Sequence, residues 1–128
     1  MKKQILIIDD APTILLVLEN IFNKEFDVVK KGNGQEALDW IESGHVPYII
    51  ISDVVMPVFG GFELITKLNQ SPLYSQIPVF VLSNTETSSE KVKFLKLGVI
   101  DYILKPFNPE EVYWKVYNLS KRIEAKIN

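Results

Sequence analysis

Five short apolar runs, separated by longer segments with mixed polarity, dominate the pattern of hydrophobic and polar positions along the chain. Short, nearly continuous apolar runs are typical of strands that are buried on both faces, as in a parallel sheet. This pattern predicts strands over residues 4–8, 26–29, 48–51, 79–82 and 100–104.

The segments between these runs repeat their apolar residues at the spacing of an amphipathic helix. In the first segment these residues fall at offsets 0, 3, 4, 7 and 8, which places them on one helical face. The positions expected to face the core are Ile14, Val17, Leu18, Ile21 and Phe22; Ala37, Leu38, Trp40 and Ile41; Phe62, Ile65 and Leu68; Val92 and Leu95, with Phe94; and Val112, Val116, Leu119 and Ile123.

Residues that favour helix ends are found directly before or after the predicted helices. Asn33 precedes the second helix and Thr87 the fourth, each with a glutamate three residues later, as in a capping box. Asn108 and Pro109 open the fifth helix, and Gly98 follows the fourth. Five strand–helix units in strict alternation predict an α/β fold, a parallel sheet with helices on both faces and right-handed crossovers.

Composition narrows the class of protein further. The length of 128 residues fits one domain, residues 1–128, and the net charge of −2 carries no basic footprint for nucleic acid. Cysteine is absent, which excludes disulfides and thiolate metal sites. No apolar stretch approaches the roughly 20 residues of a membrane span, and the N-terminal run is too short for a signal peptide. We therefore expect a soluble, cytoplasmic domain that binds neither nucleic acid nor membranes directly.

Polar residues suited to chemistry follow four of the predicted strands. Asp9 and Asp10 follow the first, Asp53 the third, Ser83 the fourth and Lys105 the fifth. In an open parallel sheet the ligand site lies beyond the carboxyl ends of the strands, so these side chains should meet. Three carboxylates repel one another unless a cation compensates, and Mg²⁺ takes oxygen ligands of this kind. An aspartate can also be a nucleophile that forms an acyl phosphate, and Asp53 is the natural candidate.

Each of these residues has a simpler explanation when taken alone. Asp9 or Asp10 could cap the first helix, and Asp53 could be a turn residue before the following proline. Ser83 could be a structural hydroxyl, and Lys105 a solvated surface charge. One cap accounts for only one of the two aspartates, and the position of all these residues at strand ends favours a shared site.

Together the motifs resemble a known family. The motifs are DD at 9–10, D…MP…GG at 53–61, SN at 83–84 and KPF at 105–107. In this order and spacing, over essentially the whole chain, they resemble the receiver domain of two-component response regulators. The resemblance implies a three-layer, flavodoxin-like, doubly wound sheet of five parallel strands in the order 2-1-3-4-5, with five helices.

The resemblance also implies a site. Asp53 would accept a phosphoryl group from a phosphohistidine on a histidine kinase or a histidine phosphotransfer protein. Asp9, Asp10, Asp53 and the backbone carbonyl of Val55 would hold Mg²⁺. Lys105 would pair with Asp53 and then with the phosphoryl oxygens.

The resemblance also implies a conformational switch. Ser83 would bond the phosphoryl group, and Tyr102, at the aromatic switch position, would swing inward when Ser83 moves. The Lys105–Pro106 bond is expected to be cis. The readout would be the face made by the fourth helix, fifth strand and fifth helix, which would contact a downstream protein or an output domain, or a second copy of the chain in a phosphorylation-dependent homodimer. The sequence leaves open the cognate kinase, the target and whether the chain is a whole regulator or part of a longer protein.

Some positions depart from the commonest family pattern. Asn84 is bulkier than the small residue usual there. Val55 and Thr85 flank the site at positions that, in the family, tune dephosphorylation. Since Val55 cannot orient an attacking water, we predict a phosphoryl lifetime that is not unusually short.

Three other functions fit these residues less well. A phosphatase of the haloacid dehalogenase type would need an acid two residues after the nucleophile, where Val55 stands. A receiver-like interaction module that is never phosphorylated usually lacks one of the acids or the lysine, all of which are present here. A flavodoxin-like cofactor carrier would need a phosphate loop after the first strand, where Asp9 and Asp10 would repel a phosphate.

The remaining aromatic residues and the lone histidine have modest roles in this interpretation. His45 is expected to be a loop residue rather than a phosphorelay histidine. Tyr113, Trp114 and Tyr117 are expected to pack beside the core stripe of the fifth helix, with any exposed part, and Phe94, forming an apolar patch on the readout face.

Overall fold

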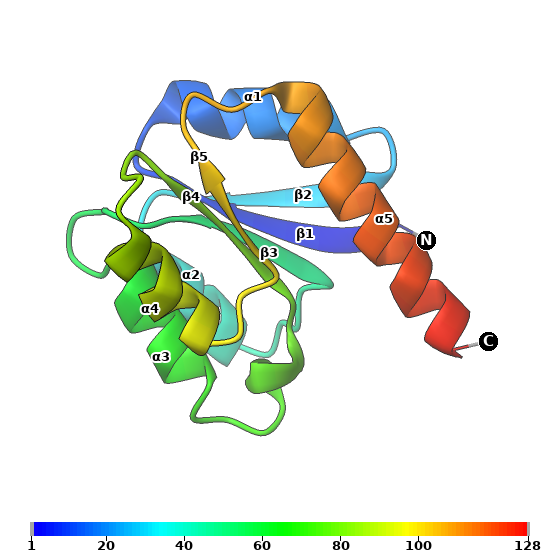
Figure 1. The fold of residues 1–128 in the computed structure, drawn as a ribbon. Helices are drawn as coiled ribbons and strands as arrows, with labels where there is room; N and C mark the ends of the chain where they lie inside the picture. Colours follow the sequence, from blue (N-terminus) through cyan, green and yellow to red (C-terminus); the bar gives the residue numbers. More distant parts are fainter. Residues whose placement is uncertain (1, 128) are drawn as a thin grey trace.

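The computed structural model describes residues 2–127 and arranges them in three layers, a central sheet with helices on both faces (Figure 1). The strands are parallel and lie in the order β2-β1-β3-β4-β5, which confirms the expected doubly wound fold. The strands are β1 (Lys3–Ile8), β2 (Phe26–Lys31), β3 (Ile49–Asp53), β4 (Val79–Ser83) and β5 (Asp101–Leu104). The helices are α1 (Pro12–Phe22), α2 (Gly34–Glu42), α3 (Gly61–Leu68), α4 (Ser88–Lys96) and α5 (Pro109–Ile127), with a 3₁₀ turn at Tyr74–Gln76.

The two faces of the sheet bury separate apolar clusters. Successive side chains of a strand point to opposite faces, so Ile49 and Ile51 pack with α1 and α5 while Ile50 packs with α2, α3 and α4. This double burial explains why the central strands read as continuous apolar runs. The edge strand β2 is the exception: Asp27 and Lys30 are exposed, so the expectation of burial on both faces was wrong for it.

The register brings the carboxyl ends of β1, β3, β4 and β5 to one edge. Ile8 pairs with Ser52, and Asp53 pairs with Leu82. Beyond the last pair of β4 and β5, the Lys105 amide donates to the Ser83 carbonyl at 2.7 Å. The polar residues of four separate segments therefore end within one small region.

The helix ends follow the predicted residues, with one difference. The Asn33 side chain accepts the Glu36 amide at 2.9 Å, and the Asn108 side chain accepts the Glu110 amide at 2.9 Å. Gly98 follows α4 with a φ of +88°, in the left-handed region that favours glycine. Thr87 is the N-cap of α4, but its side chain makes no capping hydrogen bond.

Two helices turn a different side to the core than their spacing suggested. In α4, Phe94 is fully buried while Val92 and Leu95 are each 45% exposed, so the expected core position is confirmed for Phe94 and wrong for Val92 and Leu95. The expectation that Phe94 adds to an exposed patch was wrong as well. In α1, Val17 is exposed and Leu18 and Phe22 are buried. Both helices carry apolar residues around much of their circumference, and periodicity alone does not set which side packs. Within residues 2–127, no helix is long and apolar enough to cross a membrane.

Candidate functional site

Asp9 and Asp53 are buried at the carboxyl ends of β1 and β3. One Asp9 oxygen, Oδ1, accepts the Ala11 amide at 2.9 Å. Oδ1 of Asp53 accepts its own neighbour's amide, that of Val54, at 2.9 Å. Both carboxylates are thus held by backbone amides at the ends of buried strands.

Asp10 completes a group of three acids at the rim of the site. It is exposed, and one carboxylate oxygen from each of Asp9, Asp10 and Asp53 lies within 4.8 Å of the others. The N-cap of α1 is Ala11, so capping by the aspartates, the simpler explanation, does not account for the cluster. Three hard oxygen donors with a high local negative charge fit Mg²⁺ rather than a soft or redox metal.

Lys105 reaches both buried carboxylates. Its Nζ lies 2.8 Å from Asp9 Oδ2 and 3.1 Å from Asp53 Oδ1, and its side chain is largely buried. The expected pair with Asp53 is therefore present, but the shorter contact is to Asp9, which the sequence did not indicate. The Lys105–Pro106 peptide is cis, as expected.

Burial and mutual repulsion set the protonation behaviour of this group. Burial, followed by repulsion from Asp9, raises the pKa of Asp53 above its usual value, although the Lys105 ammonium opposes the shift. Burial lowers the pKa of Lys105, but its hydrogen bonds to Asp9 and Asp53 outweigh that effect and raise it overall. An Mg²⁺ ion would therefore favour the ionised form of Asp53, the form needed for nucleophilic attack.

Ser83 and Tyr102 form a buried hydroxyl pair at the end of β4. The Tyr102 hydroxyl lies 2.8 Å from Ser83 Oγ and 3.0 Å from the Thr85 carbonyl, and the Thr85 amide donates to Ser83 Oγ at 3.0 Å. The ring of Tyr102 is buried and contacts Phe94 of α4, with 5.9 Å between centroids. Tyr102 thus lies in the inward position, in direct contact with Ser83.

Gly61, part of the quoted motif, and Ser52, which the sequence did not single out, shape the backbone around Asp53. A Cβ on Gly61 would lie 2.4 Å from the Asp53 carbonyl oxygen, so only glycine allows α3 to start this close to β3. The hydroxyl of Ser52 donates to the same carbonyl at 2.9 Å. The Gly60–Gly61 pair in the motif was a signal for the close approach, whereas Ser52 looked like any strand residue.

Other expected residues lie as follows. Val55, two residues after Asp53, is 78% exposed, and Asn84, directly after Ser83, is also exposed. His45 lies in a loop, as expected, with its ring stacked on Trp40 at 4.3 Å between centroids.

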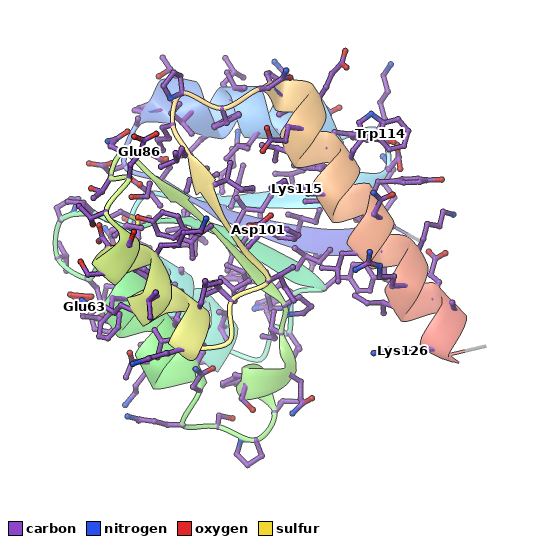
Figure 2. All side chains as sticks on the ribbon, viewed as in Figure 1. Glu63, Glu86, Asp101, Trp114, Lys115 and Lys126 are labelled. Carbon is purple, nitrogen blue, oxygen red and sulfur yellow. The ribbon has the colours of Figure 1, made fainter. Side chains whose placement is uncertain are left out.

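The aromatic residues of α5 do not form a patch on the readout face. Figure 2 shows Trp114 on the side of α5 away from β5, whereas Lys115 extends toward Asp101. Tyr113 stacks on Phe22 of α1. The expected aromatic patch therefore lies toward α1, and Phe94 does not contribute to it.

Comparison with known families agrees with this geometry. A family model described as "Response regulator receiver domain" matches residues 5–117. The chain is 35% identical over 125 residues to the alkaline phosphatase synthesis transcriptional regulatory protein PhoP of Bacillus subtilis, which covers 97% of the chain and 51% of that protein. It is 32% identical over 130 residues to histidine kinase P4 of Formosa agariphila, which covers 99% of the chain and 9% of that protein. The chain therefore spans about half the length, or less, of these curated relatives.

Solved structures give the same result. The chain is 31% identical to a putative response regulator from Chloroflexus aurantiacus, with a TM-score of 0.84, over 92% of this chain and 97% of that one. A CheY-like receiver domain protein from Methanospirillum hungatei superposes with a TM-score of 0.88 at 25% identity, over 98% of this chain and 99% of that one.

Proposed function

The chain belongs to the family of response regulator receiver domains, and from this premise we propose that it is a phosphorylation-dependent signalling switch whose phosphoryl acceptor is Asp53. The observation that carries the proposal is the position of Asp53 at the end of a buried strand, facing Asp9, Asp10 and Lys105. A carboxylate that is buried at such a cost needs a cationic partner; Lys105 is one, and a metal ion held with Asp9 and Asp10 would be a second.

The proposed reaction is a transfer from a phosphohistidine on a histidine kinase or a histidine phosphotransfer protein. A carboxylate oxygen of Asp53 attacks the phosphorus atom, the P–N bond breaks, and its electron pair returns to the imidazole of the donor. The product is an acyl phosphate on Asp53. Lys105, already within 3.1 Å of Asp53, would bind the phosphoryl oxygens and neutralise their charge.

Magnesium is the cofactor that this donor set fits. Asp9, Asp10, Asp53 and the backbone carbonyl of Val55 would hold it. When bound, Mg²⁺ screens the repulsion between the carboxylates and the incoming phosphoryl group. In its absence the raised pKa of Asp53 would keep more of the carboxyl protonated and less nucleophilic.

The output of the switch would pass through Ser83 and Tyr102. A phosphoryl group that engages Ser83 would change the hydroxyl pair, and Tyr102 contacts α4 through Phe94. Phosphorylation would then shift the population of the α4–β5–α5 face between two arrangements. That face would bind a downstream protein, an output domain or, in a phosphorylation-dependent homodimer, a second copy of the chain.

This role is regulatory. The only chemistry proposed is the acceptance and later loss of the domain's own phosphoryl group, in the cytoplasm, where histidine kinases present their phosphoryl groups. The exposed apolar Val55 offers no group to orient a hydrolytic water, and the acyl phosphate is expected to outlast a few seconds in Mg²⁺.

Intact mass spectrometry after incubation with acetyl phosphate and Mg²⁺ tests the proposal. We expect a single adduct of about +80 Da, the mass of one phosphoryl group, that is absent from Asp53→Asn and from samples with EDTA. An adduct that survives the substitution, or no adduct on the unsubstituted protein, would contradict it. Sustained turnover of a generic phosphate ester would favour the phosphatase alternative instead.

A further inference from the structure

Ser52 is a polar residue inside β3, directly before the proposed acceptor Asp53. It is fully buried, and it follows Ile49–Ile51, which pack into the two apolar clusters. A hydroxyl without a hydrogen bond costs free energy in such surroundings, and valine or isoleucine would suit a doubly buried strand better. The Ser52 hydroxyl therefore needs an acceptor, and the identity of that acceptor links it to Asp53.

The acceptor is the backbone carbonyl of Asp53, to which Ser52 Oγ donates at 2.9 Å. This carbonyl belongs to the same planar peptide unit as the Val54 amide. The Val54 amide in turn donates to Oδ1 of Asp53 at 2.9 Å. Ser52 and the Asp53 carboxylate thus bind opposite ends of one peptide unit, so the hydroxyl fixes the plane against which the carboxylate is held.

The other contacts of this peptide unit explain why the hydroxyl matters. The Val54 amide also donates to the Leu82 carbonyl of β4 at 3.1 Å, so its one hydrogen is shared between the sheet and the carboxylate. A hydrogen bond to a peptide carbonyl polarises the unit and strengthens its N–H as a donor. Ser52 therefore supports the bond from the amide to Oδ1 against the competing bond to the sheet.

The orientation of the Asp53 carboxylate matters for the proposed reaction. Oδ1 accepts the Val54 amide and is also the oxygen that Lys105 Nζ approaches at 3.1 Å. These two contacts hold Oδ1 and leave Oδ2 as the oxygen for attack on phosphorus. A misplacement of about 1 Å in a reacting group can slow a reaction about 100-fold. A residue that fixes the carboxylate therefore acts on the rate without touching the phosphoryl group.

We propose that Ser52 is a positioning residue for phosphoryl acceptance: its hydroxyl fixes the peptide unit between Asp53 and Val54, and through it the orientation of the Asp53 carboxylate. This inference rests on the proposed function of Asp53. The alternative is a purely structural serine, whose hydroxyl only satisfies a buried carbonyl. The two roles differ in what loss of the hydroxyl does to the rate of acceptance and to the Val54 amide.

The test combines a rate with a spectroscopic signal. The rate is that of labelling by acetyl phosphate with Mg²⁺, followed by intact mass, and the signal is the proton shift of the Val54 amide in ¹⁵N NMR spectra without a phosphodonor. Ser52→Ala removes the hydroxyl and Ser52→Thr keeps it. Ser120→Ala is the matched control, because Ser120 is also a buried serine, but it lies on α5 with its Oγ 3.5 Å from the hydroxyl of Tyr48, before the start of β3.

We expect Ser52→Ala to slow labelling about tenfold and to move the Val54 amide proton upfield, because the peptide unit is less polarised and less firmly held. Ser52→Thr should stay within about threefold of the unsubstituted rate, and Ser120→Ala should match the unsubstituted protein in both measurements. If urea unfolding shows that the added methyl group of Ser52→Thr disrupts the fold, Ser52→Cys replaces it. Its weaker donor should give a rate between those of serine and alanine.

Each other outcome contradicts the inference. Labelling of Ser52→Ala at the unsubstituted rate, or slow labelling with an unchanged Val54 amide, would leave Ser52 a structural role only. Equal slowing in Ser52→Ala and in the variant that keeps a donor would assign the effect to side-chain shape, and equal slowing in Ser120→Ala would assign it to the loss of any buried serine. Failure of acetyl phosphate to label the unsubstituted protein would refute the proposed function itself, whereas the Val54 amide shift would still test its link to Ser52.

Discussion

Helices α4 and α5 flank the same edge strand, β5, but they are attached to the sheet in different ways. α5 buries Val112 and Val116, and its Lys115 bonds Asp101 of β5 at 2.5 Å. α4 buries one large side chain, Phe94, and leaves Val92 and Leu95 nearly half exposed. α5 therefore buries two large side chains and adds an ion pair to β5, whereas α4 buries one large side chain and otherwise makes contacts at its surface.

The difference matters because the buried hydroxyl pair of Ser83 and Tyr102 lies next to α4, the helix with less buried apolar surface. Tyr102 contacts Phe94 and bonds Ser83 and the Thr85 carbonyl, in the loop that leads to α4. Elements that respond to a ligand are drawn from the least stable parts of a fold. If Asp53 is phosphorylated as proposed, we therefore expect the α4–β5–α5 face to respond more at α4 than at α5.

Amide exchange should show the largest contrast. We expect the amides of α4 to exchange at least about a hundredfold faster than those in the first half of α5, because local opening of α4 exposes little apolar surface. Hydrogen–deuterium exchange with mass spectrometry on peptides covering residues 88–96 and 109–119 measures it. Equal protection of the two helices would break the comparison.

Truncation of Phe94, the one large side chain that α4 buries, should have the largest effect on stability. Phe94→Ala should lower the free energy of unfolding by about 3–5 kcal/mol, because it removes a fully buried ring and leaves a cavity. Val92→Ala, on the exposed side of the same helix, should change it by less than about 0.5 kcal/mol. Urea unfolding measures both, and similar losses in the two variants would mean that α4 packs by a different side.

Removal of one hydroxyl should sharpen the comparison further. Tyr102→Phe loses the bonds to Ser83 and the Thr85 carbonyl and should cost about 1 kcal/mol. It should also speed exchange in α4. Tyr113→Phe is the control on α5, where the lost partner is the exposed Glu25, and we expect a smaller cost and no change in α4. If amide exchange in α4 were unchanged in Tyr102→Phe, the hydroxyl pair would not stabilise that helix.

The smallest effect on stability is expected for a substitution in the acid site itself, and its sign shows whether burial or the Lys105 pair dominates. Because the pKa of Asp53 is raised above 3.8, its ionisation destabilises the folded state, and stability falls as the pH rises through the raised pKa. In EDTA at pH 7, Asp53→Asn should therefore be slightly more stable than the unsubstituted protein. The gain should vanish below pH 3.8, where Asp53 is protonated in both states. Urea unfolding at both pH values tests this, and a less stable variant at pH 7 would show that the Lys105 pair outweighs burial.

Much of the site was predictable because it follows from strand ends. The parallel arrangement forces residues after β1, β3 and β5 to one edge, so Asp9, Asp53 and Lys105 could be brought together from their positions alone. The closer contact of Lys105 with Asp9 was not predictable, because it depends on the path of the loop after β5. The φ of +71° at Val58, in the loop between β3 and α3, was also missed, since valine is among the last residues expected at positive φ.

The sequence by itself determined the order of elements, the edge of the sheet that carries the chemistry and the residue types gathered there. Local pattern and chain connectivity set these properties, and both are written in the sequence. Only the tertiary structure decided which side of α4 is buried, how Lys105 divides itself between Asp9 and Asp53, and that Tyr102 lies inward against Ser83. These three features depend on how side chains from separate segments fit together in the closely packed interior, and a local sequence pattern does not contain that information.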